Sequence, residues 1–162
     1  NGFAALAVSL LFNNAPFLLY SGQEVGERGM DEEGYSGRDG RSTIFDWWKS
    51  RSQTVLWNHI HRLSELDEKD KIILDKYLSL LNLARTNCFS TGATYDLCFC
   101  NVSSPGFDPD RHFAFLRYDD KSCYLVVCNF ACHDSHVTID IPIRGTSRTV
   151  DVPAFDCYIE QL

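Results

Sequence analysis

Residue types suited to chemistry gather where an apolar run ends in a polar loop. Phe17–Tyr20 are apolar or aromatic, and Ser21–Glu27 is polar and acidic, with glycine at positions 22 and 26. Glu24 is the carboxylate at the centre of this loop. Catalysis by a carboxylate needs a partner group held beside it. The sequence alone places no such partner beside the other candidates, Asp46, Asp108 and Asp110.

A helix and a strand are expected to position this loop. Phe17–Tyr20 are too uniformly apolar to alternate, which is typical of a strand covered on both faces in a parallel sheet. Phe3–Phe12 predict the preceding helix, and the Asn-Asn-Ala-Pro connection stops it. In a parallel α/β barrel the loop after a strand lies on the face that carries the active site. Residues 1–27 therefore predict one helix, one strand and one loop of such a barrel, whose other strands are absent.

The order and spacing of these motifs resemble the α-amylase family of glycoside hydrolases. Ala4–Leu11 and Pro16–Gly26 are similar to its seventh helix, eighth strand and eighth loop, whose pattern ends Tyr-x-Gly-(Gln/Asp)-Glu-x-Gly. Ile44–Trp48 is similar to the Phe-Asp-aromatic signature after that loop, and Leu78–Arg85 resembles the last barrel helix. The resemblance implies the C-terminal portion of a hydrolase that acts on α-glucans such as starch and maltooligosaccharides.

The resemblance also implies which residues face a substrate. Aromatic side chains there would stack on sugar rings, and polar ones would bond hydroxyl groups. The expected substrate-lining residues are Tyr20, Gln23, Glu24, Arg38, Trp47 and Trp48. The family's three catalytic carboxylates lie on the fourth, fifth and seventh barrel strands, and the matching part of this chain begins after the seventh. We therefore expect no catalytic residue here, a supporting or lining role for Glu24, and no activity from the chain alone.

The second half of the chain changes from a helical period to a period of two. Asp67 is a good N-cap for a helix that ends near Thr86, and alternation begins after Cys88. The predicted strands are Tyr95–Cys100, His112–Tyr118, Cys123–Phe130, Val137–Ile141 and Phe155–Ile159. We predict an α+β chain, with the end of a (β/α)8 barrel at residues 1–87 and a C-terminal antiparallel β-sandwich at 88–162.

Seven cysteines raise the question of thiols, disulfides or metal. They are Cys88, Cys98, Cys100, Cys123, Cys128, Cys132 and Cys157. Most lie in apolar runs, where a thiol packs as a small hydrophobe. Disulfides remain an alternative, as does a zinc site of Cys98, Cys100, Cys128, Cys132 and His133, although the spacing is not that of a zinc knuckle. Asp31–Glu33 lacks the alternating oxygen ligands of a calcium loop. We expect no metal or cofactor in this chain, with calcium left open for the parent enzyme.

Charge and hydropathy limit the partners. The net charge is −7 and the pI is near 5.1, with no basic stripe, so a nucleic-acid partner is not expected. The apolar run Phe3–Phe12 is shorter than the roughly 20 residues of a membrane span and lacks signal-peptide features, so no membrane partner is expected. The compartment stays open. With barrel neighbours missing, we expect residues 1–25 to self-associate or to fold over the helix at Asp67–Arg85, and the β-sandwich to be indifferent to their removal.

A different class of function also fits the sequence. The chain could be a self-sufficient, non-catalytic module that binds carbohydrate or serves a structural role, with its helices packed on a β-sandwich. The residues encoded before Asn1 distinguish the two hypotheses, because an enzyme of this family needs the earlier barrel motifs.

Overall fold

The computed structural model describes residues 2–20, 22–26 and 66–162. The chain divides into two compact units, one of Asn1–Phe17 with Leu80–Leu162 and the other of Leu18–Ser79. The predicted features at Asp31–Glu33, Arg38 and Ile44–Trp48 lie outside the described residues. The predicted division at residue 88 concerns the architecture of the parent enzyme and stays a prediction.

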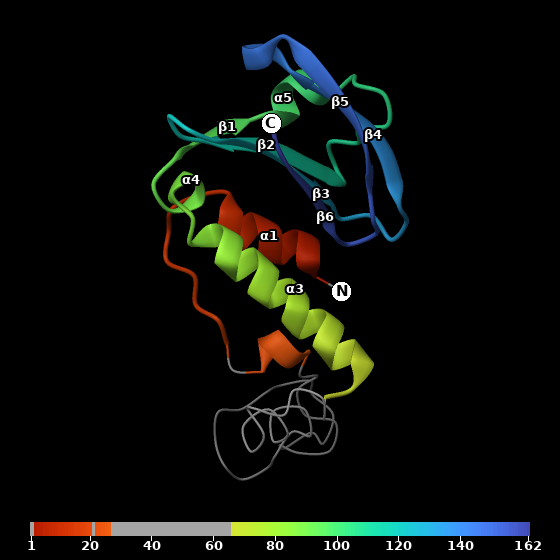
Figure 1. The fold of residues 1–162 in the computed structure, drawn as a ribbon. Coiled ribbons are helices and arrows are strands. Elements are labelled where there is room, and N and C mark those ends of the chain that lie inside the picture. Colours follow the sequence, from red (N-terminus) through yellow and green to blue (C-terminus); the bar gives the residue numbers. More distant parts are fainter. Residues whose placement is uncertain (1, 21, 27–65) are drawn as a thin grey trace. The chain divides into compact units, whose positions relative to one another are not determined.

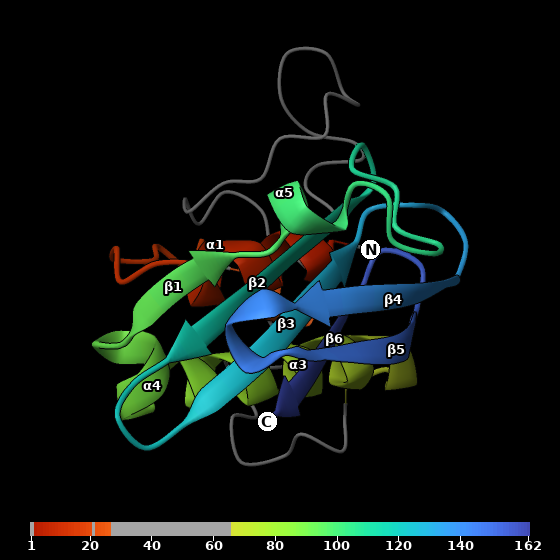
Figure 2. The same cartoon turned by 90° about the horizontal axis from the view of Figure 1, so that it is seen from above.

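The first unit is built from two antiparallel sheets. The four-stranded sheet has the order β1-β2-β3-β6, and the second sheet is the hairpin β4-β5. Their bounds are β1 Ala93–Asp96, β2 His112–Tyr118, β3 Cys123–Asn129, β4 Ser135–Ile141, β5 Thr146–Val152 and β6 Cys157–Gln161. The strands of the hairpin cross those of the larger sheet (Figure 2). This arrangement confirms an α+β chain with a sandwich-like C-terminal region.

The core between the sheets follows directly from the alternation of side chains along each strand. Leu116 of β2 and Leu125 of β3 are partners in register and are fully buried. They pack in one cluster with Val137, Ile139 and Ile141 of β4. Val150 and Val152 of β5, Val127 of β3 and Leu97 belong to the same cluster.

The opposite face of the four-stranded sheet is covered by α1, Phe3–Leu11 (Figure 1). The Phe12 ring meets the rings of Phe113 and Phe115 edge-on, at 5.2 and 5.3 Å between centroids. The Ala4 N–H donates to the Phe155 carbonyl at 3.1 Å. The buried side chains of α1 are Ala4, Leu6, Ala7, Leu10 and Leu11. The expectation that this helix lacks neighbours is therefore wrong, because the sheet itself presents an apolar face to it.

Arg117 joins several segments beneath this helical layer. Its side chain is 1% exposed, and its guanidinium donates to backbone carbonyls of Phe12, Cys88 and Phe89. It also donates to the side chains of Asn14 and Thr94. Burial lowers the pKa of Arg117, because the charged form loses hydration. Arg117 thus ties the end of α1 and the short helix α4, Asn87–Ser90, to the sheet.

The predicted strand at Phe17–Tyr20 is wrong for this structure. These residues have no regular structure, Leu18 is 86% exposed and Tyr20 is 40% exposed. A strand needs a neighbour for its backbone N–H and C=O groups, and in the described part of the chain none pairs with this segment. Self-association through residues 1–25 stays a prediction. The exposed apolar surface of this segment is smaller than expected, because the apolar side chains of α1 are already buried.

The remaining differences are local. The predicted strand Tyr95–Cys100 ends at Asp96, whose side chain accepts the Cys98 N–H at 2.7 Å and starts the helix α5, Cys98–Asn101. The long helix α3 covers Glu68–Ala84, as its predicted N-cap indicated, and the turn after it is closed by the Thr86 N–H on the Leu83 carbonyl. No helix within the described ranges is long and apolar enough to cross a membrane.

Candidate functional site

The loop after Tyr20 folds into a tight turn that carries its own hydrogen bonds. Gln23–Val25 form one turn of 3-10 helix (η1), flanked by Gly22 and Gly26, both with positive φ. The Tyr20 N–H donates to the Gln23 side chain at 2.9 Å, and the Gln23 N–H returns to the Tyr20 carbonyl at 3.1 Å. A side chain at Gly26 would place its Cβ 2.4 Å from Ile73 of α3. The glycines therefore permit both the turn and its close approach to this helix.

Glu24 is held by the turn itself. Its carboxylate accepts the Gly22 N–H at 3.1 Å, and the residue is half-buried. Burial, with a smaller contribution from the charge of Glu24, raises the pKa of the nearby Tyr77 hydroxyl. A carboxylate engaged by backbone and beside a phenol supports loop geometry. The supporting or lining role of Glu24 stays a prediction.

The predicted substrate-lining residues divide into two groups. Tyr20, Gln23 and Glu24 lie together on the turn, with the Tyr20 side chain exposed. Arg38, Trp47 and Trp48 lie outside the described residues. The lining role of all six stays a prediction.

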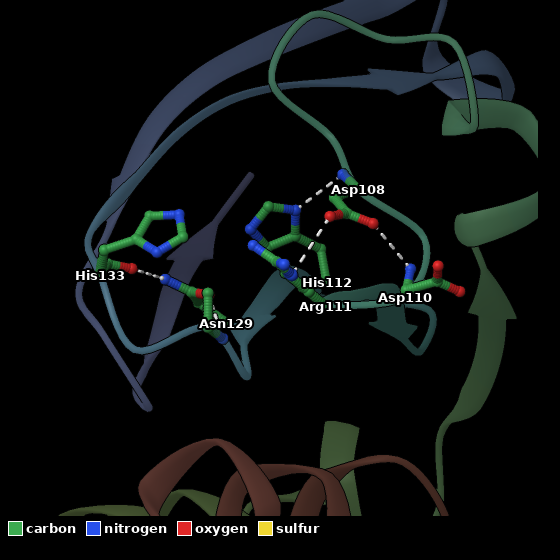
Figure 3. Close-up of polar contacts among 7 residues, drawn as sticks. Asp108, Asp110, Arg111, His112, Asn129 and His133 are labelled. Atoms are coloured by element: carbon green, nitrogen blue, oxygen red, sulfur yellow. Dashed lines mark hydrogen bonds and ion pairs between the residues drawn. The ribbon is translucent and has the colours of Figure 1, made fainter.

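A second candidate, which the sequence analysis missed, is a hollow of about 330 Å³ at one end of the sandwich. Its walls come from the loop before β2 and the loop between β3 and β4 (Figure 3). The residues that line it are Gly106, Asp108, Arg111, His112, Ala131, His133, Asp134, Ser135 and His136. The pairing of His112 with Asn129 in the β2–β3 ladder brings these loops together.

Hydrogen bonds within the two loops fix the walls of this hollow. The Asp108 N–H donates to Nδ1 of His112 at 2.9 Å, and Arg111 Nε lies 3.5 Å from the Asp108 carboxylate. The buried Asn129 amide donates to the His133 carbonyl at 2.9 Å (Figure 3). These contacts hold the two loops that form the walls of the hollow in fixed positions.

His112 is the unusual group in this hollow. It is 6% exposed, and Nε2, on the side of the ring turned toward His133, has no hydrogen-bond partner within the described structure (Figure 3). Burial lowers the pKa of His112, opposed by the charge of Asp108 and aided by His133 and Arg111. Since Nδ1 accepts the Asp108 N–H, the neutral His112 ring has its proton on Nε2.

The chemistry that this hollow can perform is limited by access and charge. Nε2 of His112 is itself screened from solvent, so a ligand cannot reach it without side-chain movement. The carboxylates are engaged: Asp108 contacts Arg111, and Asp134 accepts the Ala154 N–H at 2.9 Å. Cationic and acidic groups alternate around the walls and favour no single ligand charge. The hollow therefore identifies no reaction and no ligand class.

The alternative zinc site is not assembled. Among the described residues no three His, Cys, Asp or Glu side chains come together as metal ligands. Cys98 and Cys100 pack against the core between the sheets. Cys128 lies on the α1 face of β3, since it alternates with Val127 of that core, and Cys132 is exposed. All seven cysteines are thiols in this structure.

Comparison with known proteins gives the class of fold. No protein-family model and no curated protein matches the sequence. Solved structures do match over almost the whole chain. A cyclic α-maltosyl-(1→6)-maltose hydrolase from Arthrobacter globiformis matches with 15% identity and a TM-score of 0.55, over 98% of this chain and 29% of its own. An isomaltulose synthase from Klebsiella sp. LX3 gives 17% identity and 0.56, over 98% and 37%.

A debranching enzyme from Nostoc punctiforme extends the comparison. It matches with 16% identity and a TM-score of 0.54, over 96% of this chain and 28% of its own. These are α-amylase-family enzymes, and the chain has a fold consistent with their C-terminal portion. It spans about a third of their length.

Proposed function

We propose that this chain is the C-terminal portion of an α-amylase-type glycoside hydrolase that acts on α-glucans. The observation that carries the proposal is the extent of the structural match: 96–98% of this chain aligns with 28–38% of α-amylase-family enzymes. A free-standing sandwich module would match through its sheets alone, whereas here α1 and the turn at Gly22–Gly26 lie within the matched length.

In the proposed enzyme, residues 1–87 are the end of the catalytic barrel and 88–162 the sandwich domain. The turn at Gly22–Gly26 is a rigid part of the cleft wall, since its backbone bonds and its contact with Ile73 fix the position of Tyr20. In this proposal the exposed Tyr20 ring stacks on a sugar ring, and its exposure supports that role. Glu24 holds the turn, and the catalytic carboxylates come from the segment before residue 1.

The test begins with the sequence encoded before Asn1. We expect an Asn-His-Asp segment and carboxylates at the ends of the fourth, fifth and seventh barrel strands. The complete protein should then release reducing sugar from maltooligosaccharides. A preceding sequence without those motifs, or a complete protein that binds α-glucans without cleaving them, would favour the non-catalytic module.

Substitutions in the complete protein test the roles of the turn residues. Tyr20→Ala should raise KM several-fold, because a stacked aromatic ring binds sugar in the ground state as well as in the transition state. Tyr118→Ala is the matched control, since Tyr118 is similarly exposed at the end of β2. Glu24→Gln keeps an acceptor for the Gly22 N–H and should change kcat less than tenfold. A loss of 10³-fold or more in a folded variant would make Glu24 catalytic and overturn its supporting role.

A further inference from the structure

Two cysteines face each other across the edge of the four-stranded sheet. Cys128 of β3 is the register partner of Cys157 of β6. Partners in an antiparallel pair point to the same face of the sheet. Here that face is the one covered by α1, because Cys128 alternates with Val127, which belongs to the core on the other side.

The hydrogen bonds around this pair show how close the two residues are. The Asn129 N–H donates to the Asp156 carbonyl at 2.9 Å, and the Leu162 N–H donates to the Cys123 carbonyl at 2.8 Å. Asn129 and Asp156 therefore form a hydrogen-bonded pair, as do Cys123 and Leu162. Because the two kinds of pair alternate along an antiparallel ladder, Cys128 and Cys157 form a non-hydrogen-bonded pair. The Cα atoms of such pairs lie about 4.5 Å apart, which falls within the range of about 4.4–6.8 Å seen in disulfides.

Access to this pair comes from the edge of the sheet. β6 pairs only with β3 among the described strands, so its other edge is open. Cys157 is the first residue of β6 and is 9% exposed, whereas Cys128 is fully buried. Cys157 is thus nearer to solvent than Cys128, and its thiol is the one that a small oxidant meets first.

Other cysteines lack this arrangement. Cys98 is bonded to the backbone of Ala114, and burial raises its pKa to about 11, which disfavours the reactive thiolate. Cys132 is exposed but has no cysteine as a register partner in the described ladders. The sheet thus singles out one pair of the seven.

We propose that Cys128 and Cys157 are a site of reversible disulfide formation, with a low-molecular-weight disulfide such as oxidised glutathione as the oxidant. The Cys157 thiolate attacks the oxidant, forming a mixed disulfide and releasing one glutathione thiolate. The Cys128 thiolate then attacks the Cys157 sulfur, and the second glutathione thiolate leaves. Two protein thiols are oxidised, and one glutathione disulfide is reduced to two glutathione molecules.

The bond would close a loop over residues 129–156, which contains the whole β4-β5 hairpin. It would fasten the edge strand β6 to β3 and hold both ends of the second sheet. A cross-link over a loop of this length restricts the unfolded chain. The oxidised chain should therefore melt about 5–10 °C higher than the reduced chain.

The experiment maps thiols in the folded chain. The 162-residue chain is incubated with oxidised glutathione, quenched with N-ethylmaleimide and digested with chymotrypsin. Cleavage after Tyr124, Leu125 and Phe130 separates Cys128 from the neighbouring Cys123 and Cys132. We expect loss of two of the seven thiols, linked peptides containing Cys128 and Cys157, a higher Tm, and reversal of all three by dithiothreitol.

Variants sharpen the result. Cys157→Ala should keep all six remaining thiols, and Cys132→Ser, the matched control, should form the same link as the parent chain. Linkage of Cys157 to Cys123 or Cys132, or retention of all seven thiols in the folded chain, would overturn the proposal. A link that forms only after urea unfolding would also overturn it, because the register of the folded sheet is its basis. The map on the parent chain decides the matter even if a variant fails to fold.

Discussion

Replacing Arg117 tests whether α1, α4 and the four-stranded sheet form one cooperative structure. The guanidinium is almost fully buried, and its acceptors among the described residues are neutral groups from three separate segments. Arg117→Met keeps most of the side-chain volume and removes every donor. The substitution therefore isolates the polar contribution of this residue from its packing.

The size of the effect follows from which acceptors stay buried. The bonds to the Cys88 and Phe89 carbonyls, at 3.3 and 2.7 Å, are buried, whereas the groups near Asn14 can turn to water. A hydrogen bond from a charged donor contributes about 1.5–3 kcal/mol after desolvation. Two such bonds give about 3–6 kcal/mol, and Nε of Arg117 has no partner in the described structure, which favours the lower end. We expect a loss of about 3 kcal/mol in the free energy of unfolding.

The assay is urea unfolding at equilibrium, with thermal melting beside it. A loss of about 3 kcal/mol corresponds to a Tm lower by about 6–12 °C for a chain of this size. Arg148→Met is the matched control, because Arg148 is partly exposed and lies 3.5 Å from Glu160; it should cost less than about 1 kcal/mol. If Arg117→Met stays within about 1 kcal/mol of the parent chain, the carbonyls have other partners and the reasoning fails.

Three further predictions concern pH, backbone and activity. Because burial lowers the pKa of His112, its imidazole binds a proton in the unfolded chain near pH 6.5 but stays neutral in the folded chain at that pH. Stability should fall as the pH falls below about 6.5, and urea titrations of His112→Gln should show a shallower dependence; an equal slope would contradict this. Gly106→Ala should cost more than about 2 kcal/mol by urea unfolding, since φ is +76° and Cβ would lie 2.1 Å from the His136 carbonyl. Gly145→Ala, with φ +62° and open space, should cost about 1 kcal/mol, and equal costs would refute the steric argument. The isolated chain should release no reducing sugar from maltooligosaccharides above background, and turnover abolished by Glu24→Gln would refute the assignment of catalysis to the preceding segment.

Local patterns predicted the long elements well. The period of two over His112–Tyr118 and Cys123–Phe130 matches β2 and β3 to within one residue, because each strand buries one face in the core between the sheets. Asp67 marks the start of α3. Acidic residues at a helix N-terminus accept hydrogen bonds from its free backbone N–H groups and interact favourably with the helix dipole. Such signals depend only on neighbours in sequence.

Elements fixed by distant contacts were missed. β5, Thr146–Val152, has only Val150 and Val152 on its buried face, so its alternation is weak, and its partner β4 determines it. The four-residue helix α5 depends on Asn101, whose amide donates to the Asp140 carbonyl of β4 at 3.0 Å. A helix this short has no local stability of its own, and a contact across 39 residues is invisible to periodicity.

The site shows the same division. The turn at Tyr20–Gly26 was predictable, because its glycines and polar residues act locally. The hollow around His112 was missed, although one signal for it was present. The short connection between β2 and β3 forms a hairpin that places His112 opposite Asn129, and hence the loop of Asp108 beside that of His133. The pairing of Cys128 with Cys157 had no such signal, since no short turn joins β3 to β6.

α1 packs on the sheet formed by the second half of the chain, whichever way the parent enzyme divides at residue 88. The rings of Phe113 and Phe115 lie on the face of the sheet away from the hairpin, and Phe12 contacts both. Without residues 1–17 these rings would lose the helix that covers them, at about 1.5–3 kcal/mol for each large side chain returned to water. Arg117 would lose two of its acceptors at the same time. We therefore expect removal of residues 1–17 to destabilise the sandwich, in place of the indifference expected from the sequence. A chain that begins at Cys88 has the residues for both sheets. It lacks α1, which shields the outer face of the four-stranded sheet from water.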